Sequence, residues 1–260
     1  MAARKIALVT GAAQGIGREI ARRLASDGFD VALNDLASQG PSLAKVAAEI
    51  GHKGRLCTSH VADVTAESQV KAMVEEVVDV HGGLDVMVAN AGVAPWGSIL
   101  KVDATEWDRV MAVNIRGTFL CYKYAGRQMV AQGRGGRIIG ASSVAGKMGF
   151  PFLPAYCASK FAVMGLTQAT AQELGKHGIT VNAYAPGPLN SELMQSLASD
   201  SPQDTGTSVE EWTEFMRKMI PMGRFGDLTD ISDLVSFLAS SGAKHITGQN
   251  ISVNGGSHCS

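Results

Sequence analysis

Tyr156 and Lys160 stand four residues apart in the stretch PAYCASKFAV, residues 154–163, among small side chains. On a helix this spacing puts both side chains on one face, with Cβ atoms about 5–6 Å apart. An ammonium roughly 5 Å from a phenol favours the phenolate by about two pKa units, whereas burial of the tyrosine acts in the opposite direction. We therefore expect the pair to exchange a proton with a substrate oxygen near neutral pH.

A glycine-rich turn, TGAAQGIG at residues 10–17, follows the first apolar run and leads into an amphipathic stretch. Such a turn lets backbone N–H groups approach a pyrophosphate at a helix N-terminus. Asp35 ends the second apolar run about 20 residues later, where a carboxylate can bind a ribose diol and repel a 2′-phosphate. Gln14, Asn34 and Leu36 supply no cation for that phosphate. NAD is therefore favoured as cofactor, and NADP stays possible.

The elements that must position these residues alternate along the chain between short β-branched runs and longer stretches of helical period. Helices are predicted at 17–28, 67–82, 105–129, 155–178 and 230–242. Seven strands are predicted at 5–10, 29–35, 56–63, 84–92, 136–143, 178–187 and 249–256. This alternation predicts a doubly wound α/β fold, with a seven-stranded parallel sheet and helices on both faces.

Composition indicates a soluble globular chain without a nucleic-acid partner. Of its 260 residues 45% are hydrophobic, and 23 basic side chains balance 24 acidic ones without clustering. The apolar run at 6–9 is too short for a signal peptide, and no stretch is long enough to cross a membrane. The four cysteines and six histidines show no metal-ligand spacing. We expect a cytoplasmic protein with no bound metal and no membrane partner.

No linker rich in Pro, Gly or Ser divides the chain, so residues 1–260 are predicted to form a single dinucleotide-binding and catalytic domain. Residues 186–222 break the alternation with Ser, Asp and Pro between scattered apolar residues. Long segments of this kind tend to be binding loops, so we expect a substrate loop here. A plain surface excursion is the alternative.

These motifs together resemble the short-chain dehydrogenase/reductase family over essentially the whole chain, including its NAD-dependent acetoin/diacetyl reductases and 3-oxoacyl reductases. Residues 10–17 resemble the family's TGxxxGxG turn, and residues 90–92 its NAG element. Tyr156 and Lys160 resemble its YxxxK pair, and Ser143 stands thirteen residues before the tyrosine. Several motifs in the right order are more specific than any one of them.

The resemblance implies a Rossmann fold and assigns roles to individual residues. It implies four catalytic residues: Asn114, Ser143, Tyr156 and Lys160. The implied cofactor-binding residues are Gly11, Gln14, Gly15, Ile16, Gly17, Asp35, Asp63, Val64, Asn90, Ala91, Gly92, Tyr156, Lys160, Pro186, Gly187 and Ser191. Asn114 would position a water that relays protons, and Lys160 would hold the nicotinamide ribose. The chain departs from the family pattern at Ala89, often Asn, at Ser191, often Thr, and at Pro188 after the Pro-Gly pair.

The implied reaction moves a hydride between the nicotinamide and the carbonyl or secondary alcohol of a small, neutral substrate such as a ketone, diketone, hydroxyketone or keto ester. Tyr156 would exchange the proton while Ser143 donates a hydrogen bond to the same oxygen. The predicted walls at 93–96 and 147–153 hold Lys147 as their one cation, which favours a neutral substrate. A 3-oxoacyl thioester reductase, a polyol dehydrogenase, or a non-catalytic dinucleotide-binding sensor or scaffold are the alternatives. The family resemblance also implies a homotetramer.

Overall fold

Seven parallel strands form one sheet in the computed structural model, which describes residues 4–52 and 54–259. The strand order is β3-β2-β1-β4-β5-β6-β7. The strands are β1 (Ile6–Thr10), β2 (Asp30–Asp35), β3 (Cys57–Val61), β4 (Val86–Ala89), β5 (Gly136–Ala141), β6 (Ile179–Pro186) and β7 (Asn250–Val253). All six neighbouring pairs run parallel, which confirms the predicted seven-stranded doubly wound fold.

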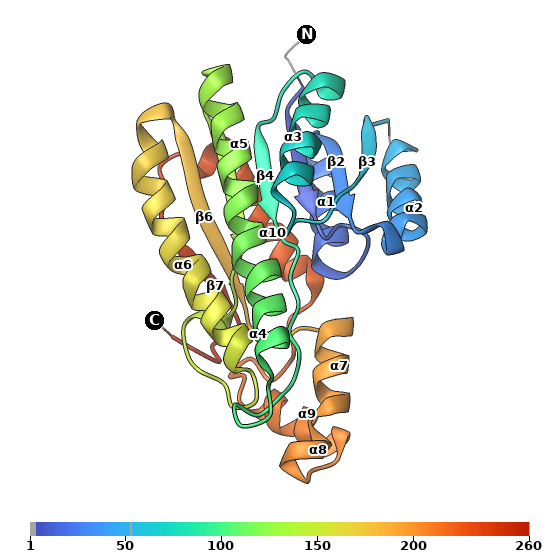
Figure 1. Cartoon of the computed structure of the whole chain (residues 1–260), viewed down its shortest axis with the longest axis vertical. Coiled ribbons are helices and arrows are strands. Elements are labelled where there is room, and N and C mark those ends of the chain that lie inside the picture. Colours follow the sequence, from blue (N-terminus) through green and yellow to red (C-terminus); the bar gives the residue numbers. More distant parts are fainter. Residues whose placement is uncertain (1–3, 53, 260) are drawn as a thin grey trace.

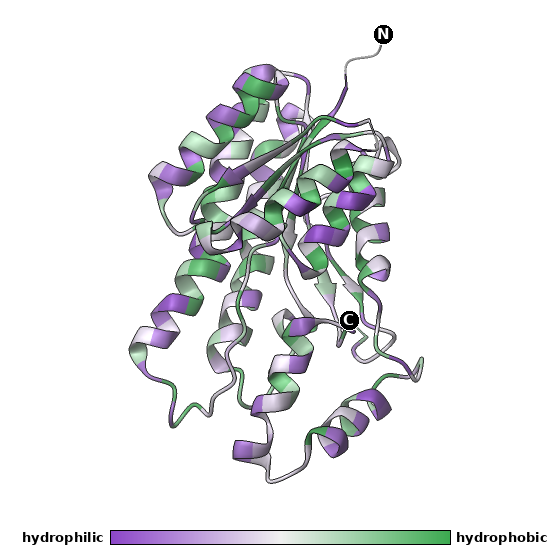
Figure 2. Cartoon of the chain, turned by 90° about the vertical axis from the view of Figure 1, so that its right-hand side faces the viewer, coloured by the Kyte–Doolittle hydropathy of each residue, from purple (hydrophilic) through white to green (hydrophobic). Residues whose placement is uncertain are grey.

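Helices cover both faces of this sheet because side chains alternate between the faces along each strand (Figure 1). In β1, Ala7 and Val9 join one apolar cluster, and Ile6 and Leu8 join another. The first cluster packs under α1 (Gly15–Ser26), α2 (Gly40–Gly51) and α10 (Leu228–Ala239). The second packs under α3 (Glu67–His81), α5 (Thr118–Gln132) and α6 (Pro154–Leu174). In Figure 2, where each residue is coloured by hydropathy, hydrophobic and hydrophilic residues alternate along the helices, as expected for helices with one buried face.

The unbroken helix predicted at 105–129 is instead three segments. Helix α4 (Ala104–Met111) passes into a π turn, η2 (Ala112–Gly117), before α5 begins. The Thr118 hydroxyl donates to the Asn114 carbonyl at 2.7 Å. π turns frequently occur at functional sites, and this one contains Asn114. The π turn is therefore consistent with a functional role for Asn114.

Residues beyond β6 form three helices that extend past the carboxyl edge of the sheet (Figure 1). They are α7 (Glu192–Asp200), α8 (Pro202–Thr205) and α9 (Val209–Lys218), called here the α7–α9 segment. Helix α9 begins with a capping box between Ser208 and Glu211. The chain returns where Leu189 forms a bridge with Gly226. The predicted long segment therefore folds as a helical projection, which the Leu189–Gly226 bridge closes at its base.

The direction of winding reverses between β1 and β4, because β2 and β3 lie on one side of β1 and the later strands on the other. In open parallel sheets, ligands bind outside the carboxyl ends of the strands at such a reversal. Within the described residues, no helix combines the length and apolarity needed to cross a membrane.

Candidate active site

A cavity of about 1040 Å³ runs along the carboxyl edge of the sheet, from the start of α1 to the α7–α9 segment. Every residue predicted to bind cofactor lines it, and so does Ser143. Asn114 is the one predicted site residue that does not reach the cavity wall, since its side chain is fully buried behind it. The structure therefore brings together residues spread from Gly11 to Ser191.

The glycine turn at one end of the cavity requires glycine at specific positions. Gly11 and Gly15 have φ angles of 63° and 55°, in the left-handed region that favours glycine. A Cβ atom at Gly17 would collide with the Gly11 carbonyl oxygen and lie 2.5 Å from the Asn90 amide nitrogen. Helix α1 starts at Gly15 without an acidic residue in its first turn. This cradle of backbone N–H groups fits a pyrophosphate.

Asn90 holds the glycine turn in place through hydrogen bonds to its backbone. Its side-chain amide donates to the carbonyls of Thr10 at 2.9 Å and Gly11 at 3.2 Å. The hydroxyl of Tyr184, a fully buried β6 residue, donates to the Asn90 Oδ1 atom at 2.7 Å. Sequence reasoning missed Tyr184, because nothing in the chain marks a tyrosine that pairs with a residue 94 positions away.

Asp35 and Asp63 line the cavity at the ends of β2 and of the segment after β3. The Asp35 carboxylate accepts from the backbone N–H groups of Ala13 at 3.0 Å and Leu36 at 2.9 Å. Asp35 therefore also fixes the glycine turn, through Ala13. Because each carboxylate oxygen retains a free lone pair, Asp35 can still accept from a ribose hydroxyl.

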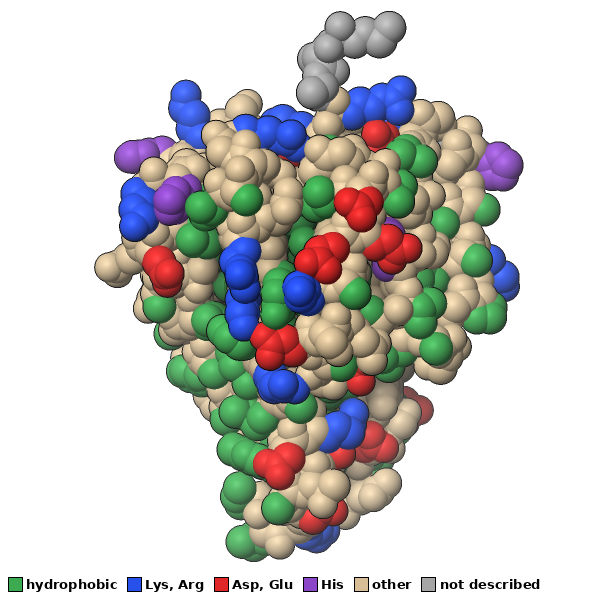
Figure 3. Space-filling model, turned by 45° about the horizontal axis from the view of Figure 1, so that its top comes forward, with side chains coloured by type: hydrophobic (Ala, Val, Ile, Leu, Met, Phe, Trp, Pro, Cys, Tyr) green, Lys and Arg blue, Asp and Glu red, His purple; other side chains and the backbone are tan. Residues whose placement is uncertain are grey.

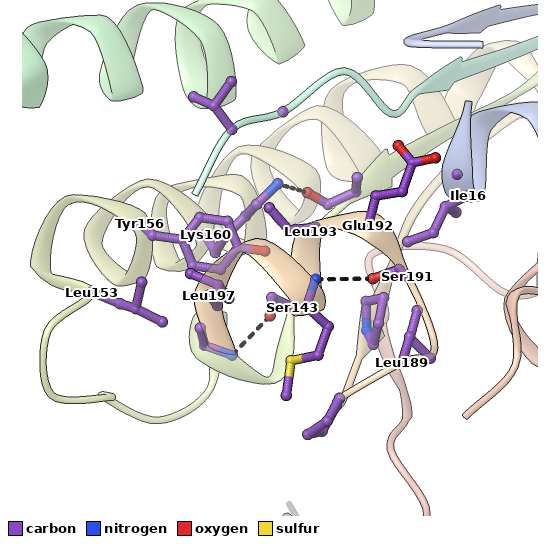
Figure 4. Close-up of a pocket in the computed structure, with 18 of the residues that line it drawn as sticks. Ile16, Ser143, Leu153, Tyr156, Lys160, Leu189, Ser191, Glu192, Leu193 and Leu197 are labelled. Atoms are coloured by element: carbon purple, nitrogen blue, oxygen red, sulfur yellow. Dashed lines mark hydrogen bonds between the residues drawn. The ribbon is translucent and has the colours of Figure 1, made fainter. Parts of the chain in front are cut away.

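The tyrosine and lysine of α6 lie side by side, as their spacing predicted (Figure 4). The Lys160 ammonium lies 5.5 Å from the centre of the Tyr156 ring. It donates to the carbonyl of Ala141, at the end of β5, at 2.8 Å. Burial disfavours the charged form and lowers the pKa of Lys160 to about 8.

In the chain without ligand the pKa of Tyr156 is raised above its ordinary value rather than lowered. Burial raises the pKa of Tyr156, and a weaker opposing effect comes from the Ser143 hydroxyl. Ser143 accepts from the Ala145 N–H at 3.1 Å, and its hydroxyl can at the same time donate a hydrogen bond on the Tyr156 side. In this state Tyr156 is a protonated phenol at neutral pH.

Asn114 ties the loop after β4 to α6. Its side chain accepts from the Val93 N–H at 2.8 Å and donates to the Val93 carbonyl at 2.9 Å. It also donates to the Ser159 hydroxyl at 3.0 Å, which in turn donates to the Tyr156 carbonyl at 2.7 Å. A Cβ at Gly92 would lie 3.3 Å from Asn114 Oδ1 and 3.4 Å from the Lys160 ammonium. The side chain of Asn114 is therefore a brace beside the lysine rather than part of the cavity wall.

The far end of the cavity is apolar and is built from the two predicted wall segments and the α7–α9 segment. Ser191, predicted to contact cofactor, caps α7 by accepting from the Met194 N–H at 3.2 Å (Figure 4). Apart from the residues assigned to cofactor, the charged lining residues are Arg109, Glu192 and Glu211, and Glu106 binds Arg109 through both carboxylate oxygens. The apolar cluster contains Ala145, Leu153, Cys157 and Leu197, with Trp96, Phe150, Tyr156, Met194 and Trp212 packed around it. Across the described part of the chain, no three His, Cys, Asp or Glu side chains group as a metal site.

Fold and cavity together define an α/β protein with a nucleotide cradle next to a Ser–Tyr–Lys group. A family model described as enoyl-(acyl carrier protein) reductase matches residues 11–258. The chain belongs to the short-chain dehydrogenase/reductase family, whose members are oxidoreductases that use nicotinamide cofactors.

Relatives match along nearly the full chain. A short-chain dehydrogenase/reductase of Armillaria gallica is 50% identical over 252 residues, which cover 97% of this chain and 95% of that protein. A 3-oxoacyl-[acyl-carrier-protein] reductase of Staphylococcus aureus is 45% identical over 252 residues, which cover 97% of this chain and 97% of that protein. The crystal structure of a short-chain dehydrogenase/reductase from Mycobacterium marinum superimposes with a TM-score of 0.90 at 35% identity, covering 98% of this chain and 96% of that one.

Proposed function

We propose that this oxidoreductase interconverts a neutral ketone and its secondary alcohol with NAD as cofactor. One observation carries the proposal: Ser143, Tyr156 and Lys160 meet where the nucleotide end of the cavity passes into its apolar end. A sensor or scaffold that only binds dinucleotide needs the glycine turn and Asp35, but has no use for this group.

The chain's own residues would divide the work as follows. The glycine turn would hold the pyrophosphate, and Asp35 the adenosine ribose. When bound, the nicotinamide supplies or accepts the hydride. In reduction the Tyr156 hydroxyl gives its proton to the carbonyl oxygen, and in oxidation the phenolate takes that proton back. Ser143 donates a hydrogen bond to the same oxygen, where negative charge develops.

Lys160 would act on the tyrosine through charge. Because burial raises the pKa of Tyr156, the phenol is an adequate acid only if the phenolate it becomes is stabilised. The ammonium 5.5 Å from the ring centre would supply that stabilisation, and would also donate to the nicotinamide ribose. Through its bonds to Val93 and Ser159, Asn114 would hold the loop after β4 against α6, the helix that carries Tyr156 and Lys160.

NAD is favoured over NADP because the Asp35 carboxylate lines the cavity where a 2′-phosphate would lie. A neutral substrate is favoured because the walls beyond Tyr156 are mainly aromatic and aliphatic. The identity to 3-oxoacyl reductases supports a second candidate, a 3-oxoacyl thioester. A polyol is less suited to these walls.

We infer further that residues 1–260 form one domain and that residues 186–222 act as its substrate loop. Self-association, as a homotetramer in the family pattern, is supported by large apolar side chains on the outer faces of α5 and α6. Phe119 is 43% and Phe161 is 40% exposed. Figure 3 shows apolar side chains gathered on the flank that α5 and α6 occupy in Figure 1. A cytoplasmic location remains a prediction from sequence.

The test is the change in nicotinamide absorbance of the purified protein, with NADH and NADPH in parallel against diacetyl, ethyl acetoacetate, cyclohexanone, acetoacetyl-CoA and a ketose. Oxidation of NADH in preference to NADPH, with a neutral ketone or keto ester as the best substrate, is the expected result. A preference for acetoacetyl-CoA would support the second candidate instead. Tight NADH binding without turnover of any compound would favour the sensor alternative.

A further inference from the structure

Three segments that are distant in sequence meet on one side chain, the indole of Trp96 in the loop after β4. Its ring stacks on Phe152 with 5.0 Å between centroids and planes 20° apart. Its edge meets Trp212 of α9 at 6.0 Å and 83°. Its ring nitrogen donates to Asp204 of α8 at 3.1 Å. Trp96 thus joins the loop after β4, the loop before α6 and the α7–α9 segment.

Asp204 holds this junction by charge. One carboxylate oxygen accepts from Trp96, and the other accepts from the Lys101 ammonium at 2.5 Å. The carboxylate side chain is only 11% exposed, while Lys101 is 69% exposed. The two donors, led by Lys101, keep the pKa of Asp204 below its ordinary value, so the carboxylate is charged at neutral pH. Hydrogen bonds to a carboxylate are stronger than those between neutral groups.

The backbone of Phe152 gives independent evidence that the junction is held in place. Its φ angle of 64° is the only positive value among the non-glycine residues that the structure describes. A bulky residue adopts this region at a cost and persists there only when its surroundings fix it. Here the Phe152 carbonyl accepts from the Gly97 N–H at 2.8 Å while the ring stacks on Trp96.

Trp96 and Tyr156 pack against the same apolar cluster at the substrate end of the cavity. The orientation of the indole therefore shapes the wall that a substrate body would contact beside the catalytic tyrosine. We propose that Asp204 is a positioning residue: by binding the Trp96 indole and Lys101, it docks α8 on the loop after β4 and fixes this wall for a neutral, apolar substrate. The proposal rests on the proposed function, because it assigns the wall to substrate.

Kinetics of Asp204→Ala test the effect on substrate. We expect KM for ethyl acetoacetate or cyclohexanone to rise about tenfold, with kcat and the Kd for NADH nearly unchanged, because one charge-assisted contact is lost outside the reacting atoms. Asp204→Asn keeps an acceptor for the indole and should recover part of that loss. Lys101→Met removes only the ion pair from an exposed position, and should raise KM by a smaller factor. An unchanged KM in Asp204→Ala would overturn the proposal.

Quenching of tryptophan fluorescence by acrylamide tests the junction without any turnover. Asp204→Ala should increase quenching in the NADH-bound protein, and this increase should vanish in a Trp96→Phe background, which isolates the Trp96–Asp204 contact. Equal quenching with and without Asp204 would contradict the proposal even if the enzyme turned over no ketone tested. A failure of the proposed function alone would leave this result intact.

Glu67→Ala is the matched control for both measurements. Glu67 also accepts from a lysine, Lys123 at 2.6 Å, and from an aromatic side chain, the Tyr124 hydroxyl at 2.9 Å, but it is the first residue of α3 and lies outside the residues that line the cavity. It should change neither KM nor quenching. If it reproduced both effects of Asp204→Ala, a general loss of stability would explain the data and the proposal would fail.

Discussion

At the scale of residues, Lys160 carries a conflict between charge and burial. Lys160 is almost completely buried, and its ammonium donates to the Ala141 carbonyl. Burial lowers its pKa from 10.5 to about 8. A buried charge that the reaction needs is a cost to the fold, and such trade-offs are common at active sites.

Lys160→Met should therefore stabilise the chain at pH 7 while it abolishes turnover. The pKa of Lys160 is lower in the folded state than in the unfolded state. Below pH about 8 the folded wild type therefore holds a buried charge, which lowers its free energy of unfolding. The wild type regains this stability as pH rises from about 8 to 10.5. After allowance for the lost hydrogen bond, we expect a gain of about 1–2 kcal/mol in the free energy of unfolding at pH 7.

Urea unfolding of ligand-free protein at pH 7 and at pH about 10 measures this gain. The gain should shrink at the higher pH, where the wild-type lysine has lost its proton in the folded state. A variant less stable than wild type at pH 7, or a difference that does not depend on pH, would refute this account of Lys160.

At the scale of elements, the sequence predicted what depends on local pattern. The seven strands and the glycine turn carry β-branched runs and a motif of their own, and the structure has them where expected. The π turn around Asn114 has no local pattern that predicts it, and the bonds from Asn114 to Val93 and Ser159 that accompany it form only after folding. Helix α2 was not among the predicted helices, and it starts with Gly40 and Pro41, two residue types that commonly mark turns.

The α7–α9 segment contained one signal that sequence reasoning passed over. Ser208 and Glu211 have the spacing of a capping box before an amphipathic run, which predicts the start of α9. The bond between Trp96 and Asp204 had no such signal, since 108 residues separate them. Local chemistry predicts where a helix starts, but not the surface on which it docks.

The glycine turn gives a prediction at the element scale. Gly17→Ala should weaken NADH binding by at least about tenfold and lower the free energy of unfolding by about 1–3 kcal/mol, because the added Cβ collides with the Gly11 carbonyl and with Asn90. Gly51→Ala, at the end of α2, meets no atom within 4 Å and is the matched control. Fluorescence titration with NADH and urea unfolding measure both effects. Equal NADH affinity in the two variants would argue against a nucleotide at this turn.

At the scale of the whole molecule, the surface charges are mixed, whereas exposed apolar side chains gather on one flank. Basic and acidic side chains mingle on the face shown in Figure 3, in keeping with a net charge of −1. The apolar flank of α5 and α6 is the surface best suited to a second copy of the chain.

Phe161→Glu should therefore lower the molar mass measured by light scattering, because a charge would be buried in the proposed interface. Leu36→Glu changes an apolar residue of similar exposure, 48%, directly after β2 and away from α5 and α6, and should leave the mass unchanged. The wild type should have the mass of four chains. A wild-type monomer, or a Phe161→Glu protein still tetrameric, would contradict this assembly.

The central claim is that Tyr156 moves the proton. Its most direct test is the single-turnover rate of ketone reduction by Tyr156→Phe, measured beside the Kd for NADH, with Tyr124→Phe as the control that loses a hydroxyl bound to Glu67 instead. The account predicts that Tyr156→Phe keeps NADH affinity and loses about 10²–10⁴-fold in rate, while Tyr124→Phe keeps both. A Tyr156→Phe protein that reduces the ketone at the wild-type rate would contradict it.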